Sequence, residues 1–214
     1  MIKKLLRTNI IWRLTGLTYT TAVIATHGSY VSKDDYLKAG KNEMAVFYPY
    51  FNSTSTVLEF GCGLGKNLFG IADKIKFGYG IDVNVFYVKI ANHLKQHYGI
   101  KNLEFISYDG THFPKLPKVD IILEKGVFER IPKNQVKKYI KELKYNYLTE
   151  NGVAILYFLM NRAKGSEFTK RLGDEAYIFW NESEITQLLK DSGLYPINII
   201  NTKFADFYIC KNLK

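Results

Sequence analysis

The stretch VLEFGCGLGKN, residues 57–67, decides how the rest of this sequence is interpreted. A short apolar run with one acidic residue ends at three glycines spaced two apart, and apolar residues with helical spacing follow from Leu68 to Ile75. The pattern predicts a strand, a tight turn and a helix, which is how nucleotide-binding α/β units begin. Glycine suits such a turn because a Cβ would forbid its backbone angles and keep a ligand away from the main chain.

The glycine spacing separates two kinds of ligand. The dinucleotide fingerprint is GxGxxG, in which two residues precede the third glycine. Here the third glycine arrives one residue early, at Gly65, and Lys66 occupies the fingerprint position. Glu59, two residues before the first glycine, would also place negative charge beside a pyrophosphate. The same carboxylate suits a ligand that carries an ammonium or sulfonium group.

Seven strands with helices between them are expected along the chain. The strands are Val57–Phe60, Phe77–Ile81, Leu103–Ile106, Val119–Glu124, Val153–Leu159 after a turn at Asn151–Gly152, Leu194–Ile200 and Phe204–Cys210. The link 201–203 is too short for a parallel crossover, so the last two strands must be antiparallel. The fold class is therefore α/β, a three-layer sheet of seven mostly parallel strands with an antiparallel last strand and helices on both faces.

Acidic residues end several of these strands. Asp82 follows the second strand, 21 residues after Gly61, near the roughly 20-residue offset at which a carboxylate accepts from a ribose hydroxyl pair. Asp109 follows the third strand, and Glu124 ends the fourth. Ligands of such sheets bind beyond the carboxyl ends of the strands, so these acids are candidate binding residues.

Residues 1–50 precede the glycine turn and are expected to form a helical extension, while residues 51–214 form the ligand-binding domain. Leu6, Ile10, Leu14 and Leu17 fall on one helical face, and the β-branched tract 18–24 is expected to be extended. A further helix should begin at a capping Ser32, with Asp35 three residues later, and continue to about residue 50. The extension either closes over the pocket as a lid or packs on the sheet edge.

The segment 57–67 resembles motif I of the class I S-adenosylmethionine-dependent methyltransferases, and the similarity covers about residues 55–210. It implies a Rossmann-like fold and S-adenosylmethionine as the cofactor. The glycine turn would face the methionine part, Glu59 would favour its ammonium, Asp82 would take the ribose and Asp109 the adenine amino group. The implied cofactor-binding set is Glu59, Gly61, Cys62, Gly63, Gly65, Asp82, Val83, Tyr108, Asp109, Gly110 and Glu124.

The segment 126–132 resembles the family's stretch after the fourth strand, where many members carry histidine in place of Arg130. That departure puts a histidine-dependent role in doubt and favours an anionic substrate. No pattern assigns the catalytic residues. A general base is needed only if the acceptor arrives protonated, and the candidates are Glu124, His112 and Glu129.

Three functions stay open at this point. The first is methyl transfer to a small molecule, because insertions that would build a large recognition surface are missing. The second is RNA methylation through a basic surface, and the third is a catalytically silent S-adenosylmethionine-binding partner subunit. The net charge of +10 and pI near 9.4 fit nucleic acid, an anionic membrane surface or an acidic substrate, but also ordinary solvated helix faces.

Two cysteines exclude a disulfide framework, and four scattered histidines predict no metal site. No apolar run reaches the length of a transmembrane helix. Arg13 and the Thr-rich tract 18–21 interrupt the apolar core that a signal peptide would need, so a cytoplasmic protein is expected.

Overall fold

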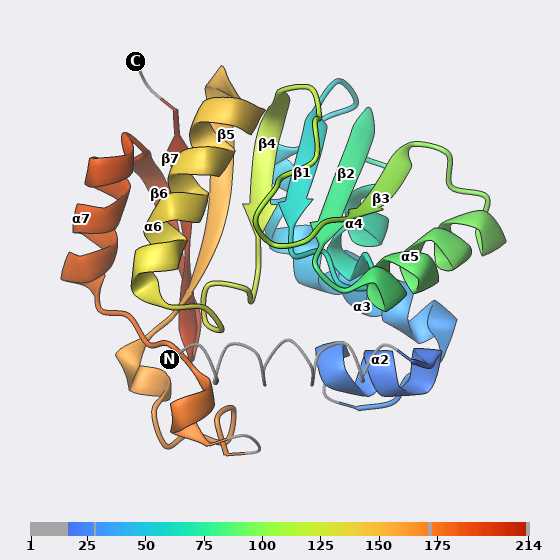
Figure 1. The fold of residues 1–214 in the computed structure, drawn as a ribbon, viewed down its shortest axis with the longest axis horizontal. Helices are drawn as coiled ribbons and strands as arrows, with labels where there is room; N and C mark the ends of the chain where they lie inside the picture. The colour runs from blue at the N-terminus through green and yellow to red at the C-terminus, as the bar shows by residue number, and fades with distance from the viewer. Residues whose placement is uncertain (1–16, 28, 171–172, 213–214) are drawn as a thin grey trace. The chain divides into compact units, whose positions relative to one another are not determined.

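The computed structural model describes residues 17–27, 29–170 and 173–212. Its strands are β1 (Thr56–Phe60), β2 (Phe77–Asp82), β3 (Leu103–Ser107), β4 (Val119–Glu124), β5 (Leu148–Leu159), β6 (Tyr195–Asn201) and β7 (Ala205–Lys211). They form one sheet in the order β3-β2-β1-β4-β5-β7-β6, with helices around it (Figure 1). The predicted α/β class is confirmed. The chain divides into two compact units, residues 1–115 and residues 116–214.

In the first unit, β1 pairs in parallel with β2, and β2 with β3. The connections are helices α4 (Lys66–Ile71) and α5 (Val85–His97). The Asn84 side chain caps α5 by accepting from the N–H groups of Phe86 and Tyr87, and Gly99, at φ +65°, follows its end. The apolar residues predicted for β1 and α4 form its core, among them Val57, Leu58, Leu68 and Ile71, which are all fully buried.

The tract expected to be extended is instead helix α2 (Tyr19–His27), so that prediction was wrong. Its first turn is held by the Thr18 hydroxyl, which accepts from the N–H of Thr21 at 3.2 Å. Ala22 and Val23 are fully buried in a cluster with Tyr36, Leu64 and Tyr87. This packing outweighs the β propensity of the tract. The predicted face at Leu6, Ile10 and Leu14 lies outside the described residues.

Helix α3 (Lys33–Met44) begins as predicted, because the Ser32 side chain accepts from the N–H of Asp35 at 3.1 Å. A 3₁₀ segment, η1 (Ala45–Tyr50), carries the helix to the expected end. Helices α3 and α4 touch main chain to main chain, since a Cβ on Gly40 would collide with Lys66 and a Cβ on Gly70 would collide with Gly40. Glycine at both positions therefore fixes α3 against the helix that follows the glycine turn.

In the second unit, β4 and β5 are parallel, and β7 is antiparallel to both β5 and β6, as predicted for the last pair. Helix α6 (Lys133–Glu142) continues into a π-helical turn, η2 (Leu143–Tyr147). Helix α7 (Glu182–Ser192) starts with a capping box between Asn181 and Glu184 and is followed by Gly193 at φ +67°. Two short 3₁₀ turns, η3 (Asn161–Ala163) and η4 (Asp174–Ala176), lie between β5 and α7.

The predicted turn at Asn151–Gly152 lies inside β5, so that boundary was wrong. The pairing jumps from Val119–Leu148 to Ile121–Val153, which is a bulge that absorbs the extra residues. The main-chain N–H of Asn212 donates to the Gly152 carbonyl and the Asn212 amide donates to that of Thr149. The backbone groups that a turn would expose therefore find partners within the sheet.

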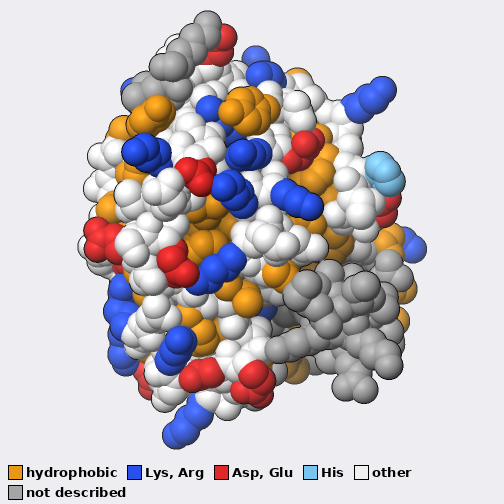
Figure 2. Space-filling model, turned by 60° about the vertical axis from the view of Figure 1, so that its left-hand side comes forward, with side chains coloured by type: hydrophobic (Ala, Val, Ile, Leu, Met, Phe, Trp, Pro, Cys, Tyr) orange, Lys and Arg blue, Asp and Glu red, His pale blue; other side chains and the backbone are white. Residues whose placement is uncertain are grey.

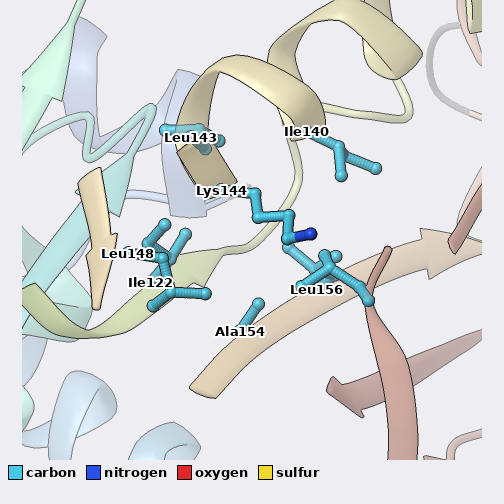
Figure 3. A pocket seen from close by; sticks show the side chains of 8 residues that line it. Ile122, Ile140, Leu143, Lys144, Leu148, Ala154 and Leu156 are labelled. Atoms are coloured by element: carbon cyan, nitrogen blue, oxygen red, sulfur yellow. The ribbon is translucent and has the colours of Figure 1, made fainter. Parts of the chain in front are cut away.

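Apolar side chains of α6 and η2 pack on β4 and β5, and Figure 3 shows Ile140 and Leu143 opposite Ile122, Leu148 and Leu156. The void between them measures only about 10 Å³. An apolar space of that size holds at most one water, so it belongs to the core and is not a ligand pocket. Within the described residues, none of the helices combines the length and hydropathy that a bilayer crossing requires.

Candidate functional site

The glycine turn is hydrogen-bonded to the end of β2. The N–H groups of Gly61 and Cys62 both donate to the Ile81 carbonyl, at 2.8 and 3.1 Å, and Gly65 N–H donates to the Cys62 carbonyl at 2.8 Å. Local and sheet hydrogen bonds thus shape the turn before any ligand arrives.

Two of its glycines serve different purposes. Both have positive φ, +55° at Gly63 and +82° at Gly65, where other residues are strained. A Cβ on Gly65 would lie 2.5 Å from the Phe105 ring, whereas a Cβ on Gly63 would meet only the Thr26 methyl, at 3.6 Å. Gly65 therefore allows packing on β3, and Gly63 leaves a cradle beside the backbone.

Asp82 joins this cradle directly. Its Oδ2 accepts from Gly63 N–H at 2.9 Å and its Oδ1 accepts from Asn84 N–H at 2.8 Å. Burial raises the pKa of Asp82, and the backbone donors oppose the rise. The carboxylate has four acceptor positions, and the N–H groups of Asn84, Gly63 and Val83 act on it, so it keeps capacity for one more donor such as a ribose hydroxyl. Val83, 42% exposed, follows at the surface.

Glu59 is a buried carboxylate beneath the turn. It is 1% exposed, and its Oε1 accepts from the Asn67 side-chain amide at 2.6 Å. The bond ties β1 to the first turn of α4, which gives Glu59 a structural role. Sequence reasoning missed Asn67, although its place in the first turn of the helix after the glycines was a signal. Cys62 packs on Gly80, and burial raises the pKa of its thiol, so it is a packing residue rather than a thiolate.

The end of β3 is bonded to the end of β2, since Tyr108 N–H donates to the Asp82 carbonyl at 3.1 Å. Asp109 closes its own turn: Oδ1 accepts from the N–H groups of Thr111 and His112, both at 2.7 Å, and Oδ2 lies 2.7 Å from His112 Nδ1. These contacts, the histidine first, hold the pKa of Asp109 well below its usual range and raise the pKa of His112.

His112 is therefore an exposed side chain paired with the Asp109 carboxylate, which is a poor position for a base. Gly110, at φ +88°, lies near Val83, with its ideal Cβ position 3.5 Å from a Val83 methyl. The Phe113 ring stacks on Phe60 at 5.9 Å and lies 5.1 Å from the Tyr108 ring. The first unit thus brings together every predicted cofactor residue except Glu124.

Glu124 belongs to the second unit and is completely buried. Oε1 accepts from the N–H groups of Val127 and Phe128, at 2.7 and 3.1 Å, and Oε2 accepts from Tyr157 N–H at 3.2 Å. Burial raises its pKa to about 8 against these three donors. Glu124 holds the loop after β4 onto β5, and its atoms are used inside the second unit.

The buried Glu129 and the half-buried Arg130 form a second group after β4. Arg130 Nε lies 3.2 Å from Glu129 Oε1, and the guanidinium stacks on the Tyr177 ring at 4.1 Å. The Tyr157 hydroxyl also bonds to Glu129. Sequence reasoning missed Tyr157, because nothing in strand periodicity connects it with a loop 28 residues earlier. Among the described residues, no cluster of histidine, cysteine and acidic side chains has the makings of a metal site.

A family model described as a methyltransferase domain matches residues 51–202 of this sequence. The chain belongs to the class I S-adenosylmethionine-dependent methyltransferases. The strand order of the sheet agrees with this family, because the sheet has seven strands and the antiparallel β7 lies next to β5. No curated protein matches the sequence.

Solved methyltransferase structures share the fold at low sequence identity. An S-adenosylmethionine-dependent methyltransferase from Aquifex aeolicus has TM-score 0.65 and 19% identity over 86% of this chain and 100% of that chain. Magnesium protoporphyrin IX methyltransferase from Synechocystis PCC 6803 has TM-score 0.70 and 17% identity, over 94% and 97%. Geranyl diphosphate C-methyltransferase from Streptomyces coelicolor has TM-score 0.64 and 11% identity, over 82% and 76%.

The cofactor of this family is S-adenosylmethionine, and the residues of this methyltransferase suit it. Gly63 leaves open space beside its half-buried backbone, since a Cβ there would meet only the Thr26 methyl, at 3.6 Å. Asp82 keeps acceptor capacity at the tip of β2. Glu59 supplies negative charge close by, as a cationic ligand needs, and a pyrophosphate would find no counter-charge in these three residues.

Proposed function

We propose that this methyltransferase transfers the methyl group of S-adenosylmethionine to a small-molecule acceptor. The observation that carries the proposal is the cradle at Gly63, bonded to Asp82 and bordered by Thr26. When bound, S-adenosylmethionine supplies an electrophilic methyl group on a sulfonium. The protein's own contribution is to bind, to align the acceptor at about 3–3.5 Å and to exclude water.

The roles follow from position. Gly63 offers backbone to the methionine part, and Asp82 accepts from the ribose hydroxyls while it keeps its bonds to Gly63 and Asn84. The Glu59 carboxylate is buried, so it acts on the ammonium through its charge and not through direct contact. Asp109 uses the remaining capacity of Oδ2 for the adenine amino group, with Tyr108, Gly110 and Val83 around the base.

Helix α2 serves as a cover for the methionine part. Thr26 stands over Gly63, and its hydroxyl lies 3.4 Å from that of Tyr36 on α3. Leu64 of the glycine turn is buried against Ala22 and Val23 of α2. The lid role expected for the region before residue 50 is supported by this packing, because closing the turn excludes water from the reacting atoms.

A small-molecule acceptor is favoured over RNA. The names of two structural neighbours refer to magnesium protoporphyrin IX and geranyl diphosphate, and an O-methyltransferase family 2 protein was solved with apigenin. On α6, the amines of Lys133 and Lys137 lie 2.6 and 2.7 Å from carboxylates of Glu184 and Asp191 on α7. In Figure 2, basic side chains are interspersed with acidic and hydrophobic ones. Neutralised lysines give little of the phosphate affinity that RNA requires.

The test measures formation of S-adenosylhomocysteine by the purified protein with S-adenosylmethionine and two separate mixtures: the small-molecule fraction of a cell extract, and total RNA. We expect product with the small molecules, at a rate that changes little with salt. Product only with RNA, falling steeply as salt rises, would contradict the acceptor class. Binding of S-adenosylhomocysteine without turnover in either mixture would favour the silent partner subunit.

A further inference from the structure

A groove of the second unit lies between α6 and α7, which pack side by side (Figure 1). Its volume is about 490 Å³, within the range of about 300–1,000 Å³ that is typical of ligand sites. The lining residues that matter for its chemistry are Lys133, Asn134 and Lys137 of α6, Trp180, and Glu184 of α7. All of them belong to residues 116–214, so the groove is complete within one unit. None of them takes part in the proposed methyl transfer.

The start of α6 has main-chain donors without acceptors. Helix α7 is capped by Asn181 and Glu184, whereas Pro132 gives α6 no side-chain cap. The N–H groups of Lys133 and Asn134 bond to no acceptor within the described residues. The first N–H groups of a helix carry partial positive charge and bind phosphates and carboxylates. Both residues line the groove, so an anion in the groove meets these donors.

A buried side chain of the groove also lacks an acceptor. Trp180 is 2% exposed, and its indole N–H has no hydrogen-bond partner in the part of the chain that the structure describes. The Lys133 ammonium lies 4.8 Å from the centre of the Trp180 ring. A buried donor without an acceptor is costly, so an acceptor that a ligand brings into the groove stabilises the complex. Trp180 is therefore a second indication, independent of the helix start, of a ligand with acceptor oxygens.

Positive charge exceeds negative charge around two carboxylates of α7, Glu184 and Asp191. Hydrogen bonds from lysines of α6 hold the pKa values of both carboxyls below their usual range, so both are ionised. The lysines whose charges act on these two carboxylates are Lys133, Lys137, Lys141 and Lys164. Four cations and two anions leave a net charge of +2. Each ammonium has three N–H donors and its ion pair occupies one, so the lysines keep donors for a further anion.

We propose that the groove between α6 and α7 binds the phosphate group of a small organic molecule. The phosphate oxygens accept from the first N–H groups of α6 and from the remaining N–H donors of Lys133 and Lys137, which are neighbours one helical turn apart. A phosphate monoester carries a charge of about −1.5 to −2 at pH 7, which matches the surplus of positive charge. RNA needs many phosphate contacts, whereas the groove provides one cluster of donors. The inference does not rest on the proposed function.

The test follows ¹⁵N-labelled full-length protein by NMR while phenyl phosphate is added. The chain has two tryptophans, so Trp12→Phe leaves the indole N–H resonance of Trp180 as the only one. We expect saturable shifts of this resonance and of the main-chain N–H resonances of Lys133 and Asn134. Phenol, the same ring without the phosphate, should shift none of them, and benzoate should bind more weakly. The absence of shifts with millimolar phenyl phosphate, an equal response to phenol, or tighter binding of benzoate would overturn the proposal.

Lysine variants separate the groove from general surface charge. Lys133→Gln and Lys137→Gln remove a charge but keep an N–H donor for the carboxylate on α7, and each should weaken phenyl phosphate binding about tenfold. Lys138→Gln is the matched control, because Lys138 is an exposed lysine of the same helix outside the groove lining, and its affinity should stay unchanged. Equal losses in all three variants would overturn the proposal. RNA that shifts the whole of α6, Lys138 included, and displaces phenyl phosphate at low salt only would do so too.

Discussion

The two units hold their polar side chains in place by different means. The first unit uses a glycine turn, strand ends and short carboxylates. Their hydrogen-bond partners are mostly close in sequence or on the next strand. The second presents long side chains, Glu129, Arg130 and Tyr157, which come from separate segments and depend on one another. The arrangement in the first unit is set by a local motif, whereas the arrangement in the second is set by packing between distant segments. The variants below probe that difference.

Gly65→Ala should have the greatest effect. The new methyl meets the Phe105 ring at 2.5 Å, at a backbone angle that alanine resists, so we expect a loss of about 3–5 kcal/mol of unfolding free energy. Gly63→Ala is the matched variant, with positive φ but open space, and should cost only about 1–2 kcal/mol while it weakens cofactor binding. Denaturant unfolding compares the two. Equal losses of stability would contradict the division of roles between these glycines.

Glu124→Gln should destabilise the second unit by about 2–3 kcal/mol, because an amide nitrogen cannot accept from a backbone N–H as a carboxylate oxygen does. It should also change the pH dependence. The native carboxyl keeps its proton up to a pKa of about 8, whereas the unfolded one loses it near 4.5. Native protein then binds more protons, so stability falls as pH rises from about 5 to 8, by up to about 1.4 kcal/mol per pH unit.

The glutamine variant lacks this titration, and its decline over the same range should be smaller. Unfolding midpoints at several pH values measure the slopes, with the exposed Glu104→Gln as control. Parallel slopes for wild type and Glu124→Gln would exclude a raised Glu124 pKa.

Asp82→Ala should weaken cofactor binding by about 1–3 kcal/mol, the usual loss for a charged hydrogen-bond partner. The effect includes release of Gly63 N–H, which Asp82 holds at 2.9 Å. Asp82→Asn is the matched variant, since its amide oxygen keeps one acceptor while the charge is lost. Titration calorimetry with S-adenosylhomocysteine measures both. Wild-type affinity in Asp82→Ala would remove this residue from the site.

His112→Ala should have the least effect. The pair with Asp109 is exposed, so unfolding free energy should not change measurably. The pKa of Asp109 should rise towards its usual range in the variant, because the His112 side chain is the first of the contacts that lower it, and a carboxyl titration of wild type and variant measures the change. A large fall in methyl transfer would mean that His112 acts in catalysis after all.

Sequence reasoning succeeded where structure is local. The glycine turn, Asp82 at the strand end and the Ser32 cap depend on neighbours within a few residues, and each is in place. Sequence reasoning failed where packing between distant segments determines the local conformation. Helix α2 forms because Ala22 and Val23 are buried against α3 and α5, and β5 runs through Asn151–Gly152 because the sheet absorbs a bulge. Tyr157 could not be linked to Glu129 because strand periodicity shows a facing direction and not a partner.

The central claim is that a sulfonium nucleoside sits on the turn at Gly63. Calorimetric titration of purified protein with S-adenosylhomocysteine and, separately, with NAD tests it most directly. We predict saturable 1:1 binding of S-adenosylhomocysteine that Gly63→Ala weakens, and no heat from NAD. Binding of NAD in place of S-adenosylhomocysteine, or equal affinity of wild type and Gly63→Ala, would contradict the claim.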